Sequence, residues 1–290
     1  MTFPLLPPEL LIVGHVTRDY IVTHPDVRDD TRLGGSASFA ARVAATLGIR
    51  TALVTVAPED FALMAPLRKL PMLSIHAAPS ADVTEFELDY TGSRRKVILR
   101  SRARRLAISD VPEAWLASPM TYVANVAGEC DRELIEGLRA PIICAELQGW
   151  LRRPGPAGAV EPMVADEVTR PPRGLNAAVF SEEDHPHAER LAEHLALSGL
   201  TVALTRSSRG ATIRQGGQRW DVPASPAREV DPTGAGDVFG IALTVSLSRG
   251  ASAPEAARAA AAIAARVVEG PGLGNLTPED ARHLPPPRRA

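Results

Sequence analysis

The alternation of short apolar runs with helical patterns is the feature that most constrains the fold of this chain. Runs that can form buried strands lie at residues 10–13, 51–56, 121–126, 141–145, 177–180 and 201–205. Helical patterns lie between or after them, at residues 39–47, 131–138, 186–197, 238–249 and 252–268. This alternation is typical of an α/β protein with a doubly wound, mostly parallel sheet and helices on both faces. We expect a single domain over residues 1–290, because a chain of this length supports one large core.

Two further segments, residues 84–90 and 96–100, alternate polar and apolar residues as strands with one solvated face do. Thr91, Gly92 and Ser93 between them predict a hairpin turn. Buried parallel strands would instead be apolar throughout. We therefore place this hairpin, with the extended segment that follows Asp19, in a small β-sheet lid formed by about residues 15–35 and 82–102.

Charge and composition argue against several classes of function. The formal net charge of −2 does not suit a nucleic-acid partner bound through its phosphates. Residues 1–11 lack the basic and apolar parts of a signal peptide, and the Ala-rich run at 256–265 is too short to span a membrane. Cys130 and Cys144 are too few for a disulfide framework. We expect a cytoplasmic protein with a loose C-terminal tail at residues 285–290.

Residues 231–237, Asp-Pro-Thr-Gly-Ala-Gly-Asp, have the pattern of an anion site followed by an acid. Gly234, Ala235 and Gly236 leave the backbone nearly bare before an apolar helical pattern, and free N–H groups at a helix N-terminus bind anions. Asp237 falls in the first turn beside them. A carboxylate repels a phosphate, so this placement makes sense if Asp237 takes the proton of a hydroxyl that attacks the phosphorus. The alternative is a glycine-rich turn whose acid only stabilises the helix N-terminus.

With this motif and the Gly34-Gly35 turn, the chain resembles the ribokinase/PfkB family of carbohydrate kinases. The resemblance implies a ribokinase-like fold with a lid over the sugar, ATP as phosphoryl donor, Mg2+ and, in many members, K+. It implies that Asp237 is the catalytic base and that the amides of Gly234, Ala235 and Gly236 form the anion hole for the transferred phosphoryl group. Lids in this family often pair between subunits, which makes a homodimer through the lid an open expectation.

The resemblance also implies further binding residues. Asp19 and the Gly34-Gly35 turn would face the hydroxyls of the acceptor, and Asp231 and Thr233 would lie near the monovalent cation. A buried polyol needs partners for its hydroxyls, and the side chains that can supply them are Asp19, Glu146, Gln148 and Arg152. The residues expected to bind the nucleotide are Ser181, Asp184, Thr205, Ser207, Gly210 and Val267. Asp184 would also hold Mg2+ through water.

The chain departs from the family pattern at three places. Phe39 stands where the family usually has Asn, and Ser207 stands where the Thr-x-Gly nucleotide loop has Gly. Ser181 and Asp184 replace the Asn and Glu of an Asn-x-x-Glu motif that helps to hold Mg2+. Loss of the Asn at position 39 argues against ribose, fructose and the common nucleosides as acceptors.

Some of these departures resemble the myo-inositol kinase branch of the family. The segments concerned are Gly-Gly-Ser-Ala-Ser-Phe at 34–39, Thr-Glu-Phe-Glu-Leu-Asp-Tyr at 84–90 and Glu-Leu-Gln at 146–148. An aromatic ring at Phe39 can cover a C–H face of a cyclic polyol. myo-Inositol is therefore the preferred acceptor. The alternatives are a kinase of a furanose sugar or nucleoside, and a non-catalytic sugar- or nucleotide-binding regulator on the same fold.

Other polar groups favour no separate chemistry. Ser36 and Ser38 lack a His in hydrolase order, so neither is expected to be a nucleophile. The spacing of His185, His187 and His194 does not place them together on a helix as metal ligands. The basic run at residues 94–105 is interpreted as a solvated edge of the lid rather than a patch for an anionic substrate.

Overall fold

The computed structural model describes residues 8–24, 30–92 and 96–287. The strands of its large sheet are β1 (Leu10–Gly14), β4 (Thr51–Ala57), β5 (Leu73–Pro79), β8 (Met120–Ala124), β9 (Ile142–Glu146), β12 (Ala177–Ser181), β13 (Thr201–Thr205), β14 (Ala211–Gln215) and β15 (Gln218–Val222). They form a nine-stranded sheet in the order β15-β14-β13-β12-β9-β8-β1-β4-β5. Neighbouring strands from β13 to β5 are parallel, and β14 and β15 extend one edge as an antiparallel hairpin. The sheet is therefore mostly parallel, as expected.

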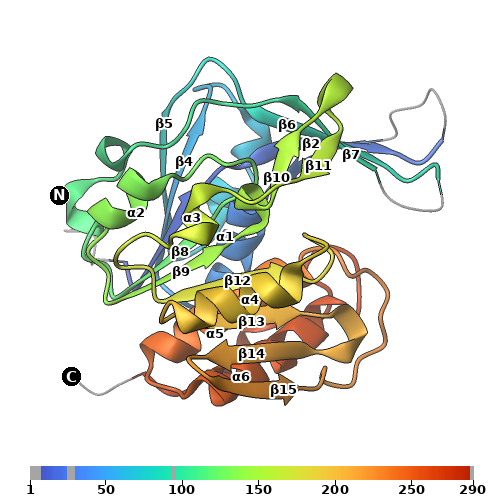
Figure 1. Cartoon of the computed structure of the whole chain (residues 1–290). Coiled ribbons are helices and arrows are strands. Elements are labelled where there is room, and N and C mark those ends of the chain that lie inside the picture. Colours follow the sequence, from blue (N-terminus) through green and yellow to red (C-terminus); the bar gives the residue numbers. More distant parts are fainter. Residues whose placement is uncertain (1–7, 25–29, 93–95, 288–290) are drawn as a thin grey trace.

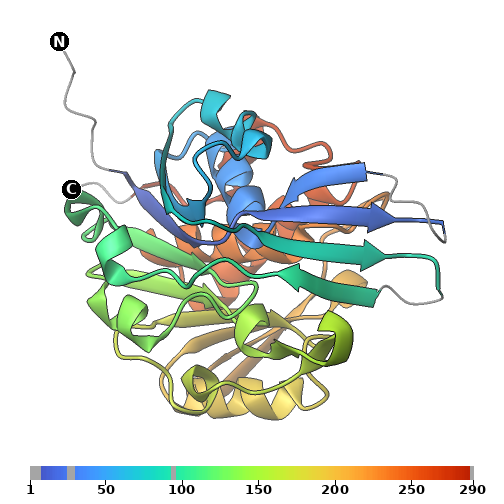
Figure 2. The same cartoon turned by 90° about the horizontal axis from the view of Figure 1, so that it is seen from above.

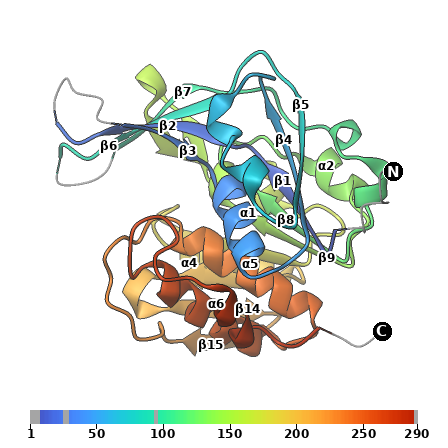
Figure 3. The ribbon, with the colours of Figure 1, turned by 180° about the vertical axis from the view of Figure 1, so that it is seen from behind.

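Helices cover both faces of this sheet (Figures 1 and 3). One layer holds α1 (Ser36–Thr46), α5 (Ala235–Ser248) and α6 (Ala253–Val267), and the other holds α2 (Arg132–Gly137), α3 (Asp166–Thr169) and α4 (Ala188–Leu197). Successive residues of β1 point to opposite faces. Leu10 and Ile12 accordingly belong to one apolar cluster, and Leu11 and Val13 to the other. Two covered faces explain why the strands are apolar throughout.

A second, four-stranded sheet projects from the carboxyl ends of the parallel strands (Figures 1 and 2). It consists of β3 (Asp30–Gly34), β2 (Thr17–Val22), β6 (Thr84–Asp89) and β7 (Lys96–Ser101), in that order, and is called the lid sheet below. Only β2 and β6 pair in parallel. Phe86 on one face packs with Val126 and Ala127. On the other face, the Glu87 carboxylate pairs with the Arg100 guanidinium at 2.7 Å. The apolar residues of β6 thus lie on the covered face, and its acidic residues lie on the opposite face, where the pairing with Arg100 leaves Glu87 only 9% exposed.

The structure contains strands that the sequence pattern did not predict. Besides β5, β14 and β15, these are the short strands β10 (Arg152–Pro154) and β11 (Val160–Pro162), which pair antiparallel. The cause lies in their composition: prolines and charged residues mask a strand signal at an edge that is exposed to water. The hairpin turn ends at Ser93, and the basic run includes Arg94 and Arg95. These residues, like 1–7 and 288–290 of the two termini, lie outside the described residues.

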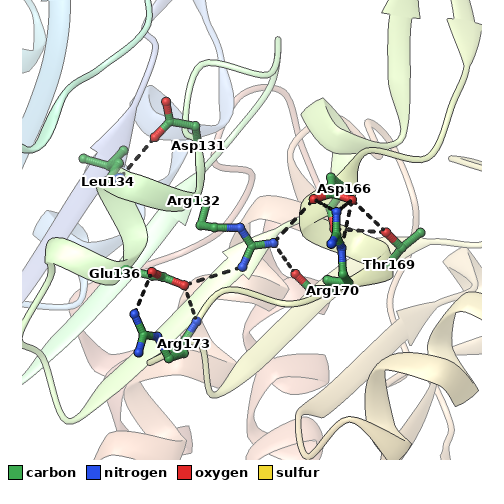
Figure 4. A network of polar contacts seen from close by, with 8 residues as sticks. All are labelled: Asp131, Arg132, Leu134, Glu136, Asp166, Thr169, Arg170 and Arg173. Atoms are coloured by element: carbon green, nitrogen blue, oxygen red, sulfur yellow. Dashed lines mark hydrogen bonds and ion pairs between the residues drawn. The ribbon is translucent and has the colours of Figure 1, made fainter.

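A network of charged groups joins α2 to α3 (Figure 4). Arg132 donates to the Glu136 carboxylate at 3.5 Å and to the carbonyl oxygen of Arg170 at 2.5 Å. The Arg170 guanidinium in turn donates to the Asp166 carboxylate at 2.7 Å. Each exposed pair of this kind contributes little to the free energy of folding. Together the pairs link the short helix α3 to α2, and we assign them no binding role. In the part of the chain that the structure describes, no helix is long and apolar enough to cross a membrane.

Candidate functional site

The N-terminus of α5 forms the glycine-rich loop at the carboxyl end of the large sheet. Gly234 is the N-cap of the helix, with a φ of 81° that glycine adopts without strain. The Phe39 ring lies against it, because a Cβ at Gly234 would be 2.5 Å from Phe39 Cδ1. A Cβ at Gly236 would meet nothing within 4 Å. The first turn of α5 therefore faces open space at Gly236, where an anion can approach its backbone N–H groups.

Asp237, in the first turn of α5, has its carboxyl next to that of Glu146 at the end of β9. Burial raises the pKa of Asp237 to about 6, and a hydrogen bond from Glu146 opposes that rise. Burial, together with the negative charge of Asp237, raises the pKa of Glu146 well above its usual range. Two carboxyls hydrogen bond to one another only if one of them holds a proton. The directions of these shifts favour the neutral form at Glu146 and leave Asp237 as the more acidic carboxyl of the pair.

Two buried hydroxyls, from Ser36 and Tyr122, lie beside this carboxyl pair, and the sequence analysis assigned neither to the site. Ser36 opens α1 and Tyr122 lies in β8, with 4% and 0% of their surface exposed. The Ser36 hydroxyl is close to both carboxyls, yet no contact of either hydroxyl has the geometry of a regular hydrogen bond. Ser36 directly follows the Gly34-Gly35 turn, which is the signal that could have placed it here. Tyr122 lies within an apolar strand, and no motif beside it indicates a site residue.

Arg152 is the positively charged side chain of the site. Its Nε donates to the carbonyl oxygen of Val126 at 2.8 Å, and its guanidinium lies 5.0 Å from the centre of the Phe86 ring of the lid sheet. Its charge favours the ionised forms of three carboxyls, those of Glu146, Asp184 and Asp237. The site therefore gathers more negative than positive charge, which suits a bound cation.

Asp184 and Gln148 complete this cluster. Asp184 Oδ2 accepts the backbone N–H of Ser181 at 2.7 Å, and Gln148 Nε2 donates to Oδ1 at 3.4 Å. Burial raises the pKa of Asp184. Among the described residues, no group of three or more His, Cys, Asp or Glu side chains could hold a metal ion. One carboxylate together with donor phosphates is, however, the usual coordination of Mg2+, and Asp184 fits that pattern.

Asp19 and the Gly34-Gly35 turn lie together at the base of the lid sheet. The Thr17 hydroxyl donates to Asp19 Oδ1 at 2.6 Å. A Cβ at Gly34 would be only 1.9 Å from Asp19 Oδ2, so a glycine is required for this approach. Asp19 pairs in register with Phe86. Paired residues of neighbouring strands share a face, so Asp19 lies on the same face of the lid sheet as Phe86, which contacts Arg152.

The residues expected to bind the nucleotide and the monovalent cation lie in separate loops. Thr205 ends β13, and Gly210 packs against β15, where a Cβ would be 2.1 Å from the carbonyl oxygen of Val222. Asp231 Oδ1 accepts the backbone N–H of Thr233 at 2.9 Å. Ser207, with a φ of 50°, lies in the turn between Thr205 and Gly210. These roles stay predictions.

Val267 is placed differently from the other predicted nucleotide-binding residues. Its side chain has 0% exposure and belongs to the apolar cluster around α5 and α6. Direct contact of this side chain with a nucleotide would require the packing around it to move. Its visible role is to support the following turn, because its carbonyl oxygen would be 2.1 Å from a Cβ at Gly274.

Parts of the chain are similar to known kinases. Residues 174–280 match the model of the pfkB family carbohydrate kinases. A cytidine kinase of Thermococcus kodakarensis is 24% identical over 262 residues, which cover 86% of this chain and 92% of that protein. An inositol 3-kinase of Arabidopsis thaliana is 27% identical over 257 residues, covering 86% of this chain and 70% of that protein.

A solved structure of a pyrophosphate-dependent kinase in the ribokinase family, in complex with a pyrophosphate analogue and myo-inositol, is similar over almost the whole chain. The TM-score is 0.79 at 21% identity, and the match covers 95% of this chain and 100% of the other. This likeness shows the ribokinase-like fold. Residues 174–280 thus match the pfkB family of carbohydrate kinases, and the chain as a whole has the ribokinase-like fold.

Proposed function

We propose that this protein transfers the γ-phosphoryl group of ATP to a hydroxyl of a small sugar or polyol, with myo-inositol as the preferred acceptor. The observation that carries the proposal is the Asp237 carboxyl beside the open glycine-rich loop, with a pKa of about 6. A general base works best when its pKa lies near the pH of the reaction. Asp237 therefore has both the place and the basicity to accept the proton of an attacking hydroxyl.

The other groups of the site have roles that follow from their positions. The N–H groups of Gly234, Ala235 and Gly236 would hold the transferred phosphoryl group, with help from the α5 dipole. Glu146 would keep the Asp237 carboxylate oriented through its hydrogen bond. Arg152, Gln148 and Asp19 would pair the remaining hydroxyls of the acceptor. Asp184 would hold Mg2+ through water, and the bound ion supplies positive charge to the phosphate oxygens.

The acceptor is inferred from the chain and its relatives together. The inositol 3-kinase and the structure with myo-inositol both cover most of this chain. Phe39 is partly buried against Gly234, so its ring can form an apolar wall beside the reacting group. Acceptors of hydrogen bonds such as Asp19 and Glu146 suit an uncharged polyol with many hydroxyls.

A second candidate is a nucleoside kinase, because the cytidine kinase matches over 92% of its own length. The donor also has a second candidate: the kinase solved with myo-inositol is described as pyrophosphate-dependent. A regulator that binds sugar or nucleotide without turnover is the remaining alternative. Pairing of two chains through the lid sheet, K+ near Asp231 and Thr233, and a cytoplasmic location stay predictions.

The test is a matrix of donors and acceptors. ATP and pyrophosphate would each be supplied with Mg2+, with and without K+, to the purified protein and to its Asp237→Asn variant. The acceptors would be myo-inositol and other inositols, ribose, fructose, fructose 6-phosphate, adenosine and cytidine, with the phosphorylated product identified directly. Transfer to myo-inositol that disappears in Asp237→Asn supports the proposal. Transfer to cytidine alone favours the second candidate, and binding without transfer in any combination favours the regulator.

A further inference from the structure

The connections between the lid sheet and the large sheet meet at His15. His15 itself lies on the connection from β1 to β2. Thr84 begins β6, and Arg104 follows the end of β7, and both contact the His15 ring. Gly35, between β3 and α1, packs on the His15 backbone, since a Cβ there would be 2.6 Å from the His15 carbonyl oxygen. One residue thus contacts all the segments by which the chain enters or leaves the lid sheet.

The hydrogen bonds of the imidazole define its protonation. Nε2 lies 3.0 Å from the carbonyl oxygen of Arg104, which can only accept, so Nε2 carries the hydrogen. Nδ1 then accepts from the Thr84 hydroxyl at 2.7 Å, and Thr84 Oγ1 accepts the backbone N–H of Ala103 at 3.1 Å. His15 and Thr84 have 0% exposure. Because water does not reach this junction, loss of one partner leaves a buried polar group unpaired.

The backbone of His15 is anchored to the loop that supports the lid sheet. Its N–H donates to Glu129 Oε1 at 3.0 Å. The same buried carboxylate accepts the N–H of Val126 at 3.0 Å and that of Ala127 at 2.6 Å. Val126 and Ala127 are also the residues on which Phe86 packs. The Glu129 carboxylate therefore ties the junction to the apolar support of the lid sheet.

We propose that His15 is a positioning residue that sets the angle of the lid sheet over Asp237, with Thr84 as its partner. This rests on the phosphoryl transfer proposed above. Asp19 lies in β2, directly after the junction, so a change in this angle moves a predicted acceptor ligand. The angle also determines whether water reaches the transferred group, because closure of such elements excludes water from the reaction. Loss of the His15–Thr84 hydrogen bond should let water compete with the acceptor.

The test compares Thr84→Val with Thr84→Ser. Valine keeps the shape of threonine and removes the hydroxyl, whereas serine keeps the hydroxyl. Thr201→Val is a matched control at the far end of β13, because Thr201 is also buried and its hydroxyl oxygen accepts from Gln215 Nε2 at 2.9 Å. Two quantities are measured: donor hydrolysed per acceptor phosphorylated, and amide hydrogen exchange of β6 and β7 relative to α4. Thr84→Ala is the second variant if Thr84→Val does not fold.

Thr84→Val is expected to raise the ratio of hydrolysis to transfer about tenfold or more and to speed exchange in β6 and β7 by a similar factor, because the Thr84 hydroxyl loses two buried hydrogen bonds, to His15 and from Ala103. Thr84→Ser and Thr201→Val should stay close to the wild type. Equal behaviour of Thr84→Val and Thr84→Ser, or faster exchange in α4 as well, overturns the proposal. If no acceptor is found, the exchange experiment still decides the role of the junction, while the kinase proposal fails separately.

Discussion

The Glu146 carboxyl, at the end of β9, lies next to the Asp237 carboxyl, in the first turn of α5, and their contact opposes the rise in the pKa of Asp237 that burial causes. Burial and the negative charge of Asp237 raise the pKa of Glu146 well above its usual range. Arg152 is the cation that favours the ionised form of Asp237, and Asp184 is the next carboxylate of the same cluster. Asp237 is therefore the carboxyl of the pair that is better suited to act as a base.

Asp237→Asn should abolish transfer and should stabilise the fold. We expect kcat to fall by several orders of magnitude while donor and acceptor still bind. The folded pKa of about 6 lies above the unfolded value near 4, so the folded state binds the proton more tightly and stability falls as pH rises through this window. At pH 8 the variant should be more stable than the wild type by about 1–3 kcal/mol. Urea unfolding at pH 8 and at about pH 3 measures this, and the difference should vanish at the lower pH, which is below both pKa values.

A comparison of Glu146→Gln with Glu146→Leu should separate the effect of the Glu146 hydrogen bond on Asp237 from the effect of its side-chain volume. The amide of Gln can still donate to Asp237, so the acidic limb of the kcat/KM profile should stay near pH 6. Leu removes the donor, and the Asp237 pKa should rise, which moves that limb to higher pH. The pH profiles of both variants provide the comparison. An identical profile for Gln and Leu would show that Glu146 does not act on Asp237.

Gly236→Ala and Gly234→Ala form a matched pair within one loop. The methyl group at position 236 enters open space, and Ala favours the helix by about 1 kcal/mol, so stability should be kept or increased. The same methyl group would occupy the anion space, so the KM of the donor should rise while the KM of the acceptor changes little. At position 234 the φ of 81° and the Phe39 ring oppose any Cβ, so this variant should be less stable. Melting curves and donor titrations distinguish the two effects.

Gly34→Ala should act on the acceptor through Asp19. The added methyl group would collide with the Asp19 carboxylate, which must move away from its present place. We expect the KM of the acceptor to rise about tenfold or more, with the donor KM unchanged. Asp19→Asn is the control, because it changes the charge and leaves the backbone as it is. An unchanged acceptor KM in both variants would remove Asp19 from the acceptor site.

The pattern of residues along the chain was sufficient for the class of fold and for the two glycine turns. Continuous apolar runs predicted buried parallel strands, and the alternation at residues 84–90 predicted the lid sheet. The hairpins β10–β11 and β14–β15 were missed: β10, β11 and β15 are rich in polar residues or prolines, and β14 is a run of only five residues, the first three of them buried. A periodic pattern of apolar residues arises where side chains are buried, and strands at the edge of a sheet bury fewer side chains.

The sequence by itself determined that Asp237 follows a bare helix N-terminus, because both features lie within a few neighbouring residues. Only the tertiary structure decided that Glu146 lies next to Asp237, that Ser36 and Tyr122 lie beside this pair, and that His15 contacts the segments that connect the lid sheet to the large sheet. These contacts join residues far apart in the chain. Their pKa shifts and hydrogen bonds arise from desolvation in the folded core, which no local pattern of residues specifies.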